Sequence, residues 1–272
     1  MVEALYQPFP IPGRARGHVW HHVPETRRPR HFHAEPELNL IAAGAASFGY
    51  GEATIEVSEG DLLWWPPGQD HVLLSATPDL DLYVVGVTPA FSEQVLGDRL
   101  SSALGGAARL RLDARALAEL RASCGSQASV CDSAALERHV GALWREAHAL
   151  RVRTADRHPL TARALSSLLA RPELKRGELA RLIHGNESEV SRHFHRDLGL
   201  TLLTYRTRLR LLRFIQLVES GGGHNFMAAA LVAGFGSYSQ CHRSFQQAFD
   251  CTPRVFFETG VGERLKERLA PF

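Results

Sequence analysis

The sequence predicts two domains, an all-β barrel in the N-terminal half and an all-α pair of helix-turn-helix units in the C-terminal half. A chain of 272 residues is long enough for two hydrophobic cores. Up to about residue 87, apolar residues fall in short runs separated by Gly, Pro and acidic turns, as in a series of short strands. Beyond residue 113 they recur every three or four residues, which is the period of a helix. The predicted boundaries are 1–112 for the barrel, 113–150 for a helical hairpin, 151–159 for a linker and 160–272 for the second domain.

Composition and charge limit the classes of function. Hydrophobic residues make up 44% of the chain and charged residues 22%, which is typical of a globular protein and excludes a disordered one. Residues 151–272 contain 19 Arg or Lys against 11 Asp or Glu, a formal charge of +8 in a chain whose total is +2. This asymmetry favours a nucleic-acid-binding surface on the second domain. No apolar run reaches the length of a membrane span, there is no apolar signal core, and the four cysteines form no CxxC pair, so we expect a cytoplasmic protein with free thiols.

The barrel is predicted strand by strand. Residues 1–16 are rich in Pro, Gly and Arg, and we expect an irregular or edge segment there. Seven apolar runs follow, and each is predicted to form a strand: 18–23, 38–42, 47–50, 54–57, 61–65, 72–75 and 82–87. Because side chains alternate along a strand, one of Trp64 and Trp65 must face the interior and the other the outside. The inward one, like Tyr50, either lines a pocket or packs within the sheets.

Two motifs in this region carry residues with binding chemistry. The first is His31-x-His33-x3-Glu37-x6-Gly44, and the second runs from Gly60 to His71 as Gly-x5-Pro-x-Gly-x2-His. Both resemble the signature motifs of the cupin barrels, although Ser75 stands where the second motif often has Asn. His31 and His33 are expected on the same face of a strand, and a barrel can bring Glu37 and His71 to that face.

Three interpretations of His31, His33, Glu37 and His71 remain open. Three imidazoles and one carboxylate suit one divalent ion, such as Zn, Ni, Mn or Fe(II), with coordination positions left for a ligand. Alternatively, the four side chains bind a small effector directly, without a metal. In the third interpretation their role is purely structural.

Two helices are predicted after the barrel, at 114–122 and 133–150. The longer one has an apolar stripe at three- and four-residue steps, formed by Leu136, Val140, Leu143, Trp144, Ala147 and Leu150. Such a stripe must be buried against something. We expect it either in a dimer interface or against the barrel of the same chain.

The linker and the first helix-turn-helix unit come next. Periodicity is lost over 151–159, which is rich in Arg and ends in Pro. Helices are expected at 160–169 and from Pro172 to Ile183, since Pro fits the first turn of a helix. Asn186 with Glu189 three residues later resembles a capping box and predicts the start of the next helix. Its buried stripe is Val190, Phe194 and Leu198.

One long helix is predicted to join two such units. From Thr201 to about Glu219 it would be about 28 Å long, close to the roughly 34 Å between successive major-groove faces on one side of DNA. Its arginines are expected to contact phosphates: Arg206, Arg208, Arg210 and Arg213. A short apolar helix around 226–233 follows and ends at Gly234. The next helix is capped by Ser237 or Ser239, a last one lies near 255–257, and 261–272 forms a tail.

The segment from Gly234 to Pro253 reads Gly-Phe-x-Ser-x-Ser-x3-Arg-x-Phe-x3-Phe-x2-Thr-Pro. It closely resembles the signature of the AraC/XylS-type bacterial transcription regulators. Three residues depart from that signature: Cys241 replaces an aromatic residue, Gln246 a Lys or Arg, and Asp250 a Gly.

The earlier unit resembles the first of the two helix-turn-helix units of the same family. It does so through Ser191, Arg192, Phe194 and Gly199. His184 stands there in place of the usual turn Gly and Asn186 in place of the usual Ser.

The expected DNA contacts are polar residues that face outward on the second helix of each unit. Their side chains suit base edges or phosphates. A solvated helix face would explain any one of them alone, but two such helices in one domain favour DNA. The set is Ser188, Glu189, Ser191, Arg192, His195, Arg196, Ser237, Tyr238, Ser239, Gln240, His242, Arg243 and Gln246.

The sequence therefore predicts a sequence-specific DNA-binding transcription regulator, not an enzyme, controlled by a small molecule or metal in the barrel. The family resemblance implies activation more than repression. The expected partners are double-stranded DNA, the effector, a second copy of the chain and RNA polymerase, with no membrane. The alternative is a metal-dependent cupin enzyme, of the oxygenase or isomerase type, that carries a DNA-binding tail. A metal-responsive regulator combines both sets of residues.

Overall fold

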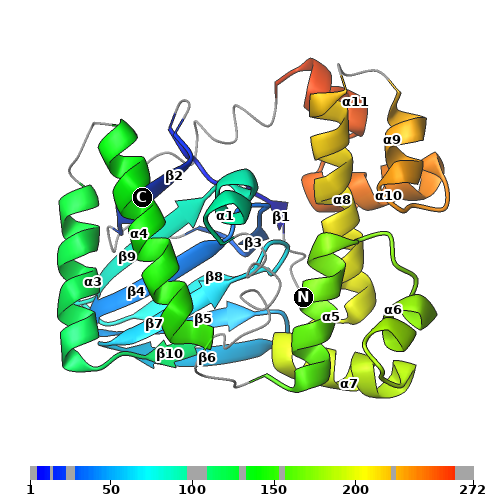
Figure 1. Cartoon of the computed structure of the whole chain (residues 1–272). Helices are drawn as coiled ribbons and strands as arrows, with labels where there is room; N and C mark the ends of the chain where they lie inside the picture. The colour runs from blue at the N-terminus through cyan, green and yellow to red at the C-terminus, as the bar shows by residue number, and fades with distance from the viewer. Residues whose placement is uncertain are drawn as a thin grey trace.

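Two antiparallel sheets and a short parallel pair of strands form the N-terminal domain, shown in a computed structural model in Figure 1. The structure describes residues 5–12, 15–22, 28–96, 109–128, 133–152, 157–221 and 225–260. The strands are β1 (Leu5–Tyr6), β2 (Gly17–His21), β3 (His31–Phe32), β4 (Glu37–Ala43), β5 (Ala45–Tyr50), β6 (Ala53–Ser58), β7 (Asp61–Trp65), β8 (Val72–Ala76), β9 (Asp81–Val87) and β10 (Arg109–Arg111).

The larger sheet has the strand order β10-β7-β4-β9-β2 and the smaller one the order β6-β5-β8. The seven predicted strands are present as β2 and β4 to β9, with ends that differ from the prediction by at most two residues. Parallel pairing joins β1 to β3, and these two strands lie between the sheets and the C-terminal domain (Figure 1).

Alternation along β7 separates two apolar cores. Trp65 faces inward and joins Ile41 and Phe48 in the core between the two sheets. Trp64 faces outward, and its ring centroid lies 4.5 Å from that of Trp144. The inward side chain of the tryptophan pair is therefore Trp65, and the outer face of the larger sheet is covered by helices.

Three helices cover that outer face: α1 (Pro89–Leu96), α3 (Ala114–Gln127) and α4 (Ser133–Val152). The stripe of α4 is buried in one core with the larger sheet at Val140, Leu143, Trp144 and Ala147. The structure thus shows this stripe packed against the barrel of its own chain rather than in a dimer interface. Of the predicted stripe, the side chains of Leu136 and Leu150 lie outside the described part of the chain.

The C-terminal domain consists of helices. They are α5 (Pro159–Ala170), α6 (Arg176–Leu182), α7 (Glu187–Leu198), α8 (Leu202–Ser220), α9 (Phe226–Val232), α10 (Tyr238–Phe249) and α11 (Pro253–Glu258). The long helix α8 connects the pair α6 and α7 to the pair α9 and α10, each of which forms a helix-turn-helix (Figure 1). The predicted two-domain architecture, a β-barrel domain followed by a double helix-turn-helix domain, is confirmed.

The ends of these helices follow from their capping residues. The Asn186 side chain accepts a hydrogen bond from the Ser188 amide at 2.8 Å and begins α7, and Thr201 caps α8 in the same way. The prediction that Pro172 opens a helix was wrong, since residues 172–173 form a turn and α6 begins at Arg176. Of the predicted linker, 153–156 lie outside the described residues, as does the predicted tail at 261–272. No helix within the described ranges is both long and apolar enough to cross a membrane.

Candidate functional site

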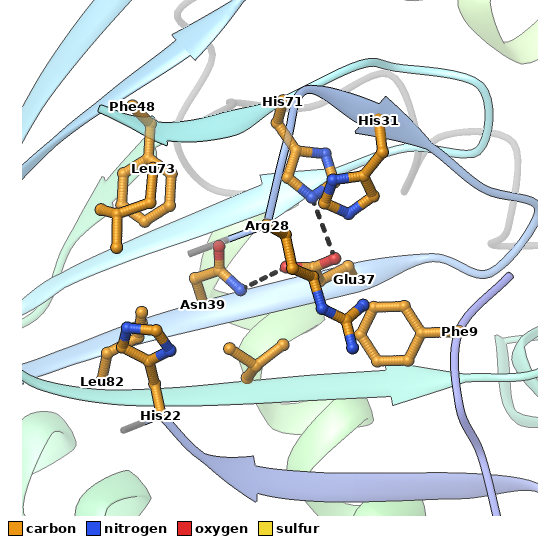
Figure 2. Close-up of a pocket in the computed structure, with 11 residues that line it drawn as sticks. Phe9, His22, Arg28, His31, Glu37, Asn39, Phe48, His71, Leu73 and Leu82 are labelled. Atoms are coloured by element: carbon orange, nitrogen blue, oxygen red, sulfur yellow. Dashed lines mark hydrogen bonds and ion pairs between the residues drawn. The ribbon is translucent and has the colours of Figure 1, made fainter. Parts of the chain in front are cut away.

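The four residues predicted from the two motifs meet inside the N-terminal domain. His31 lies on β3, His33 follows it, Glu37 begins β4, and His71 pairs with His31 through two backbone hydrogen bonds of 3.2 and 3.0 Å. The four residues are at most 4% exposed. One ligating atom from each histidine lies within 4.8 Å of the other two. Figure 2 shows His31 and His71 side by side above the Glu37 carboxylate.

Backbone carbonyls fix the protonation pattern of the histidines. The Nδ1 atoms of His31 and His33 lie 2.8 and 2.7 Å from the carbonyl oxygens of Pro29 and Glu35, and His71 Nδ1 lies 3.4 Å from that of Gln69. A carbonyl only accepts hydrogen bonds, so each Nδ1 must carry the proton. In the neutral ring, each Nε2 then offers a lone pair toward the centre of the cluster.

The Glu37 carboxylate completes a set of electron-pair donors. Its Oε2 atom lies 2.9 Å from His33 Nε2 and 3.2 Å from His71 Nε2. If both rings are neutral and donate through Nδ1, they have no proton to share with this oxygen, and a positive charge at the centre of the cluster would then bind these lone pairs. A divalent ion supplies that charge, and carbonyl-oriented imidazoles with a carboxylate are typical metal ligands. The residues present therefore fit a metal ion.

Outside this cluster, a chain of hydrogen bonds holds the carboxylate in place. Asn39 Nδ2 donates to Glu37 Oε1 at 2.6 Å, and Trp65 Nε1 donates to Asn39 Oδ1 at 2.8 Å. The Trp65 ring also stacks on His71, with centroids 5.0 Å apart and planes 4° apart. Trp65 thus orients two members of the cluster. Asn39 was not predicted from the sequence, because a single polar residue on a strand carries no motif.

Burial sets the charge states at this site. It holds the pKa of His31 well below its ordinary value, and the neighbouring His71 and His33 act in the same direction. Burial alone would raise the pKa of Glu37, but interactions with His71 and His33 outweigh it and hold that pKa well below the ordinary value. A neutral imidazole beside an ionised carboxylate is the form that ligates metal.

A cavity of about 60 Å³ adjoins the cluster. His31, Glu37 and His71 line one end of it. The remaining lining residues, which the sequence motifs did not indicate, are Phe9, His22, Arg28, Asn39, Phe48, Leu73, Leu82 and Val84. The cavity therefore offers a second group of polar side chains and an apolar wall beside the predicted ligands.

The predicted DNA contacts lie on α7 and α10, the second helix of each helix-turn-helix. Their positions are fixed by apolar residues on the opposite face, such as Phe194 in α7 and Phe245 in α10, both fully buried. Ser191, Tyr238 and His242 are half-buried, and the rest of the predicted set is exposed. Ser237 also caps α10 by accepting from the Gln240 amide at 3.2 Å. DNA contact by these residues stays a prediction.

The arginines of α8 were predicted to contact phosphates, but two of them donate hydrogen bonds to the protein backbone instead. Arg210 is buried and donates to the carbonyls of Pro172 and Glu173, at 2.8 and 2.9 Å. Arg206 donates to the Leu174 carbonyl at 3.2 Å. One nitrogen of Arg206 and two of Arg210 thus donate to backbone oxygens of the segment before α6. Arg213 is exposed, and its contact with phosphate stays a prediction.

Arg208 connects α8 to the barrel. Its Nη1 atom lies 2.6 Å from Asp70 Oδ1 and donates to the Gly68 carbonyl at 3.2 Å. The guanidinium carbon lies 4.9 Å from the centroid of the Phe32 ring. Asp70 is also paired with Arg30 at 2.8 Å, so one buried carboxylate holds two arginines. In this conformation Arg208 faces the barrel.

Further contacts hold the two domains together. The Tyr205 hydroxyl donates to the Pro67 carbonyl at 2.8 Å, and Gln69 Nε2 donates to the Leu198 carbonyl at 3.2 Å. Gly199, whose φ is +65°, lies so close to the barrel that an added Cβ would come within 2.7 Å of the Tyr50 carbonyl oxygen. His195, a predicted DNA contact, has its Nε2 atom 3.6 Å from Glu52 Oε2 of the barrel.

The first strand also reaches the second domain. The ring of Tyr6 on β1 lies 4.6 Å from that of Phe249 at the end of α10 and 6.3 Å from that of Phe256 on α11. Tyr6 and Phe32 belong to the same buried cluster as the second helix-turn-helix. The core of the C-terminal domain therefore includes side chains from the N-terminal one.

Comparison with protein families gives two matches. The model of the AraC-like ligand-binding domain matches residues 18–171, which is more than half of the chain, and a helix-turn-helix domain model matches residues 179–259. No curated protein sequence matches the chain.

Several solved structures are similar to the chain at low identity. ToxT from Vibrio cholerae is 12% identical, with 92% of this chain and 97% of ToxT covered and a TM-score of 0.42. The AraC-like transcriptional activator CuxR is 13% identical over 74% of this chain and 72% of its own, with a TM-score of 0.35. Oxalate decarboxylase from Bacillus subtilis, studied for its Mn(II) centres, is 25% identical over 28% of this chain and 22% of its own, with a TM-score of 0.24.

Proposed function

The chain belongs to the AraC family of DNA-binding transcription regulators with an N-terminal ligand-binding domain, and we propose that it activates transcription in response to a metal ion bound in its barrel. The observation that carries the metal part of the proposal is the cluster of three histidines whose ligating atoms lie within 4.8 Å of one another, with Glu37 Oε2 at 2.9 and 3.2 Å from the Nε2 atoms of His33 and His71. The ion would be held by His31, His33, Glu37 and His71, and it would supply the positive charge that this donor set requires.

The metal site lies next to the contacts between the domains. His31 is followed by Phe32, which packs on Arg208, and His71 is preceded by Asp70, which pairs with Arg208. Phe32 directly follows His31, and Asp70 directly precedes His71. A ligand that draws His31 and His71 together would therefore shift both residues that contact Arg208. Occupancy of the barrel would thereby alter how firmly α8 and the recognition helices are held, which is a differential interaction of the kind that shifts a conformational equilibrium.

Metal content and DNA binding, measured on one preparation of the untagged full-length protein, test the proposal. We expect one divalent ion per chain by elemental analysis, selective binding to genomic DNA fragments at low salt, and a change in DNA affinity after the metal is removed with a chelator. His33→Ala should abolish the metal response while the protein still folds. An affinity that is identical with and without metal, in protein shown to bind the ion, would contradict metal control.

The sign of regulation needs a separate measurement. A promoter identified by DNA selection and fused to a reporter should be expressed more strongly in cells that contain the protein than in cells that lack it. Deletion of the barrel should abolish the response to metal. Lower expression in the presence of the protein would show repression instead.

Metal-dependent catalysis is the second candidate, because three of the four proposed ligands, His31, Glu37 and His71, also line the cavity, where a small substrate could reach a bound ion. It predicts turnover of a small substrate by the metal-loaded protein. A regulator without enzymatic activity would bind metal and DNA and form no product.

A further inference from the structure

The two recognition helices, α7 and α10, carry side chains that correspond position by position. Asn186 caps α7 and Ser237 caps α10. The sixth residue after the cap is an arginine in both helices. The third residue after the cap is Glu189 in α7 and Gln240 in α10. The helices therefore match at the sixth position and differ in charge at the third.

These third and sixth positions lie on the outer face of each helix. Residues three apart are neighbours on the surface of a helix. Here both are exposed, Glu189 with Arg192 on α7 and Gln240 with Arg243 on α10. Each helix is the second of its helix-turn-helix (Figure 1), the one whose N-terminal residues contact base edges in this motif. The four side chains are thus placed to select bases.

Glu189 has no role in starting its own helix. A Glu or Gln at the third position commonly caps the helix that carries it. Glu178 Oε2 accepts from the Lys175 amide at 2.8 Å at the start of α6, and Gln240 Oε1 accepts from the Gly236 amide at 3.0 Å. Glu189 makes no such bond, and within the described ranges its carboxylate has neither a hydrogen bond nor an ion pair. Its carboxylate is therefore not used by the fold.

Other charged side chains of α7 are paired within the protein. Glu187 lies 3.1 Å from Arg176 of α6, and the neighbours Arg196 and Asp197 are 2.8 Å apart. The Arg192 guanidinium, like the carboxylate three residues before it, has no hydrogen bond or ion pair in the part of the chain that the structure describes. An acid and a base at this spacing can pair with each other, but here they do not. Both groups are available to a ligand.

The chemistry of a carboxylate restricts the base that Glu189 can face. A carboxylate only accepts hydrogen bonds, and the phosphates beside the groove repel it, so it needs an amino group opposite. In the major groove cytosine presents the N4 amino group and adenine the N6 amino group, whereas guanine and thymine present acceptors. Adenine also places the N7 acceptor beside its amino group, where the second carboxylate oxygen would meet a lone pair. Cytosine is therefore the base that suits Glu189.

Arginine has the opposite requirement. A guanidinium only donates, and guanine presents O6 and N7, two acceptors that match its paired donors. Arg192 and Arg243 stand at corresponding positions, so each suits a guanine. Gln240 carries no charge, and its amide oxygen already accepts from the Gly236 amide. The α10 helix therefore has no group that requires cytosine at the third position.

We propose that α7 reads a cytosine with Glu189 and a guanine with Arg192, and that Glu189 makes the two halves of the DNA site different. Three residues advance about 4.5 Å along a helix, against about 3.4 Å between base pairs, so the two bases belong to the same or neighbouring pairs. Both halves contain the guanine, and only the half bound by α7 requires the cytosine. The inference rests on the proposed function, since it presupposes sequence-specific DNA binding.

Selection from random double-stranded DNA tests the proposal. The untagged full-length protein, with its metal content determined beforehand, should select cytosine at one position in one half of the site. Glu189→Gln should select adenine there, because glutamine bonds both N6 and N7 of adenine. Glu187→Gln is the matched control. It makes the same change two residues away, where it breaks an exposed pair with Arg176, and should keep cytosine.

Fluorescence anisotropy on four versions of the selected site, one for each base at that position, gives the size of the effect. The parent protein should prefer cytosine by about tenfold or more. Glu189→Gln should bind the cytosine version more weakly than the parent does and the adenine version more tightly. Other positions of the site should keep their preferences, since Arg192 and the second recognition helix are unchanged.

A cytosine preference that survives Glu189→Gln would overturn the proposal. An equal rise in affinity for all four versions would overturn it too, because Glu189 would then repel phosphates without reading a base. Loss of the preference in Glu187→Gln would assign the position to the other carboxylate and contradict it as well. A selected site whose preferences do not depend on Glu189 rejects this inference alone and leaves specific DNA binding standing. No selected sequence with the parent protein would reject the proposed function and this inference with it.

Discussion

His184 and Asp250 have left-handed backbone conformations, with φ of 54° and 52°, at the turn after α6 and at the end of α10. Both stand where the family resemblance expects Gly. A side chain in this conformation costs about 1–2 kcal/mol because Cβ approaches the following carbonyl oxygen. The helix-turn-helix geometry therefore imposes the conformation even where the sequence opposes it.

Replacing His184 with Gly should stabilise the protein. The side chain is exposed, so its removal loses no core packing. Relief of the left-handed strain, less the greater freedom that Gly gives the unfolded chain, should raise the free energy of unfolding by about 0.5–1 kcal/mol. Chemical denaturation of the full-length protein measures it. Thr259→Gly is the control, since Thr259 ends α11 with a φ of −103° and should lose stability. A His184→Gly variant no more stable than its parent would refute the strain argument.

Asn39 should influence metal affinity without touching the ion. Asn39→Ala removes the donor that orients Glu37 Oε1, and residues in this position typically change metal affinity by about 10–100-fold. Trp65→Phe keeps the ring against His71 but removes the N–H that holds Asn39, so it should have a smaller effect. Competition with a chromophoric chelator measures both. Equal affinities in all three proteins would show that Glu37 is held by other means or does not ligate.

Single residues were predictable from the sequence where they belong to a motif. His31, His33, Glu37 and His71 were identified together, because their spacing is specific and an imidazole or carboxylate suits metal. Arg28 was not, since it lies among Arg27, Pro29 and Arg30 in a run that resembles an exposed basic segment. The half-burial of Arg28 beside the cavity depends on tertiary packing, of which the local sequence gives no sign.

At the scale of single elements, α10 lacks one basic side chain that the family signature usually has. Gln246 is exposed on this helix at that position. Gln246→Lys should therefore add one phosphate contact, raise DNA affinity at low salt and steepen the dependence of log K on log salt by about 0.9. Ser126→Lys places the same charge at the exposed end of α3 on the other domain and is the control. Fluorescence anisotropy over a series of salt concentrations measures both variants, and equal slopes would place Gln246 away from the DNA.

The junction between the β8 side of the barrel and α8 should depend on one carboxylate. Asp70→Asn leaves Arg208 and Arg30 without their buried anion, which typically costs about 3–5 kcal/mol. Glu258→Gln, which breaks an exposed pair with Arg254, should cost less than about 0.5 kcal/mol. Thermal and chemical unfolding of the full-length protein compare the two variants. Similar losses in both would mean that the domains are not held by Asp70.

The contribution of Asp70 should also depend on pH. Burial by itself raises the pKa of Asp70. The charges and hydrogen bonds of Arg208 and Arg30 lower this pKa by more than burial raises it, so it lies below the ordinary 3.8. Stability from a group with a lowered pKa is present above the ordinary value and is lost as pH falls through the value in the folded protein. The difference in unfolding free energy between the parent protein and Asp70→Asn should be constant from about pH 7 to 5 and shrink below about pH 4. A difference that grows as pH falls would contradict this.

Elements with a clear apolar period were predicted well, and short ones were not. The seven longer strands alternate or form apolar runs, whereas β1, β3 and β10 have two or three residues and are strands only because a distant segment pairs with them. The start of α6 was predicted at the wrong residue, also because a distant segment determines the structure there. Arg210 of α8 binds the carbonyls of Pro172 and Glu173, and this long-range contact holds a turn where the proline alone suggested a helix.

At the scale of the whole molecule, two recognition helices on one chain should read two adjacent major grooves. DNase footprinting on a selected site should show protection on one face of the DNA over two successive turns. Arg192→Ala on α7 and Arg243→Ala on α10 should each weaken binding by about 1–3 kcal/mol and relax base preference in a different half of the site. Loss of preference in the same half for both variants would exclude this arrangement.

The order of the two domains was predictable from the sequence, and the contact between them was not. Composition, charge and motif each change near residue 151, which marks two units. Their interface uses polar donors on backbone carbonyls, as at Pro67 and Leu198, and one close approach at Gly199. These groups have no periodicity or characteristic spacing, so they resemble ordinary surface until the fold brings them together.

The packing of Tyr6 against Phe249 and Phe256 has a consequence for biosynthesis. At about 5–20 residues per second, these partners leave the ribosome roughly 10–50 s after Tyr6. The side of the Tyr6 ring that faces Phe249 and Phe256 is therefore left open until translation is almost complete. A prematurely terminated chain that ends before α10 lacks both Phe249 and Phe256, so these two native contacts of the first strand form only in a chain that extends through α11.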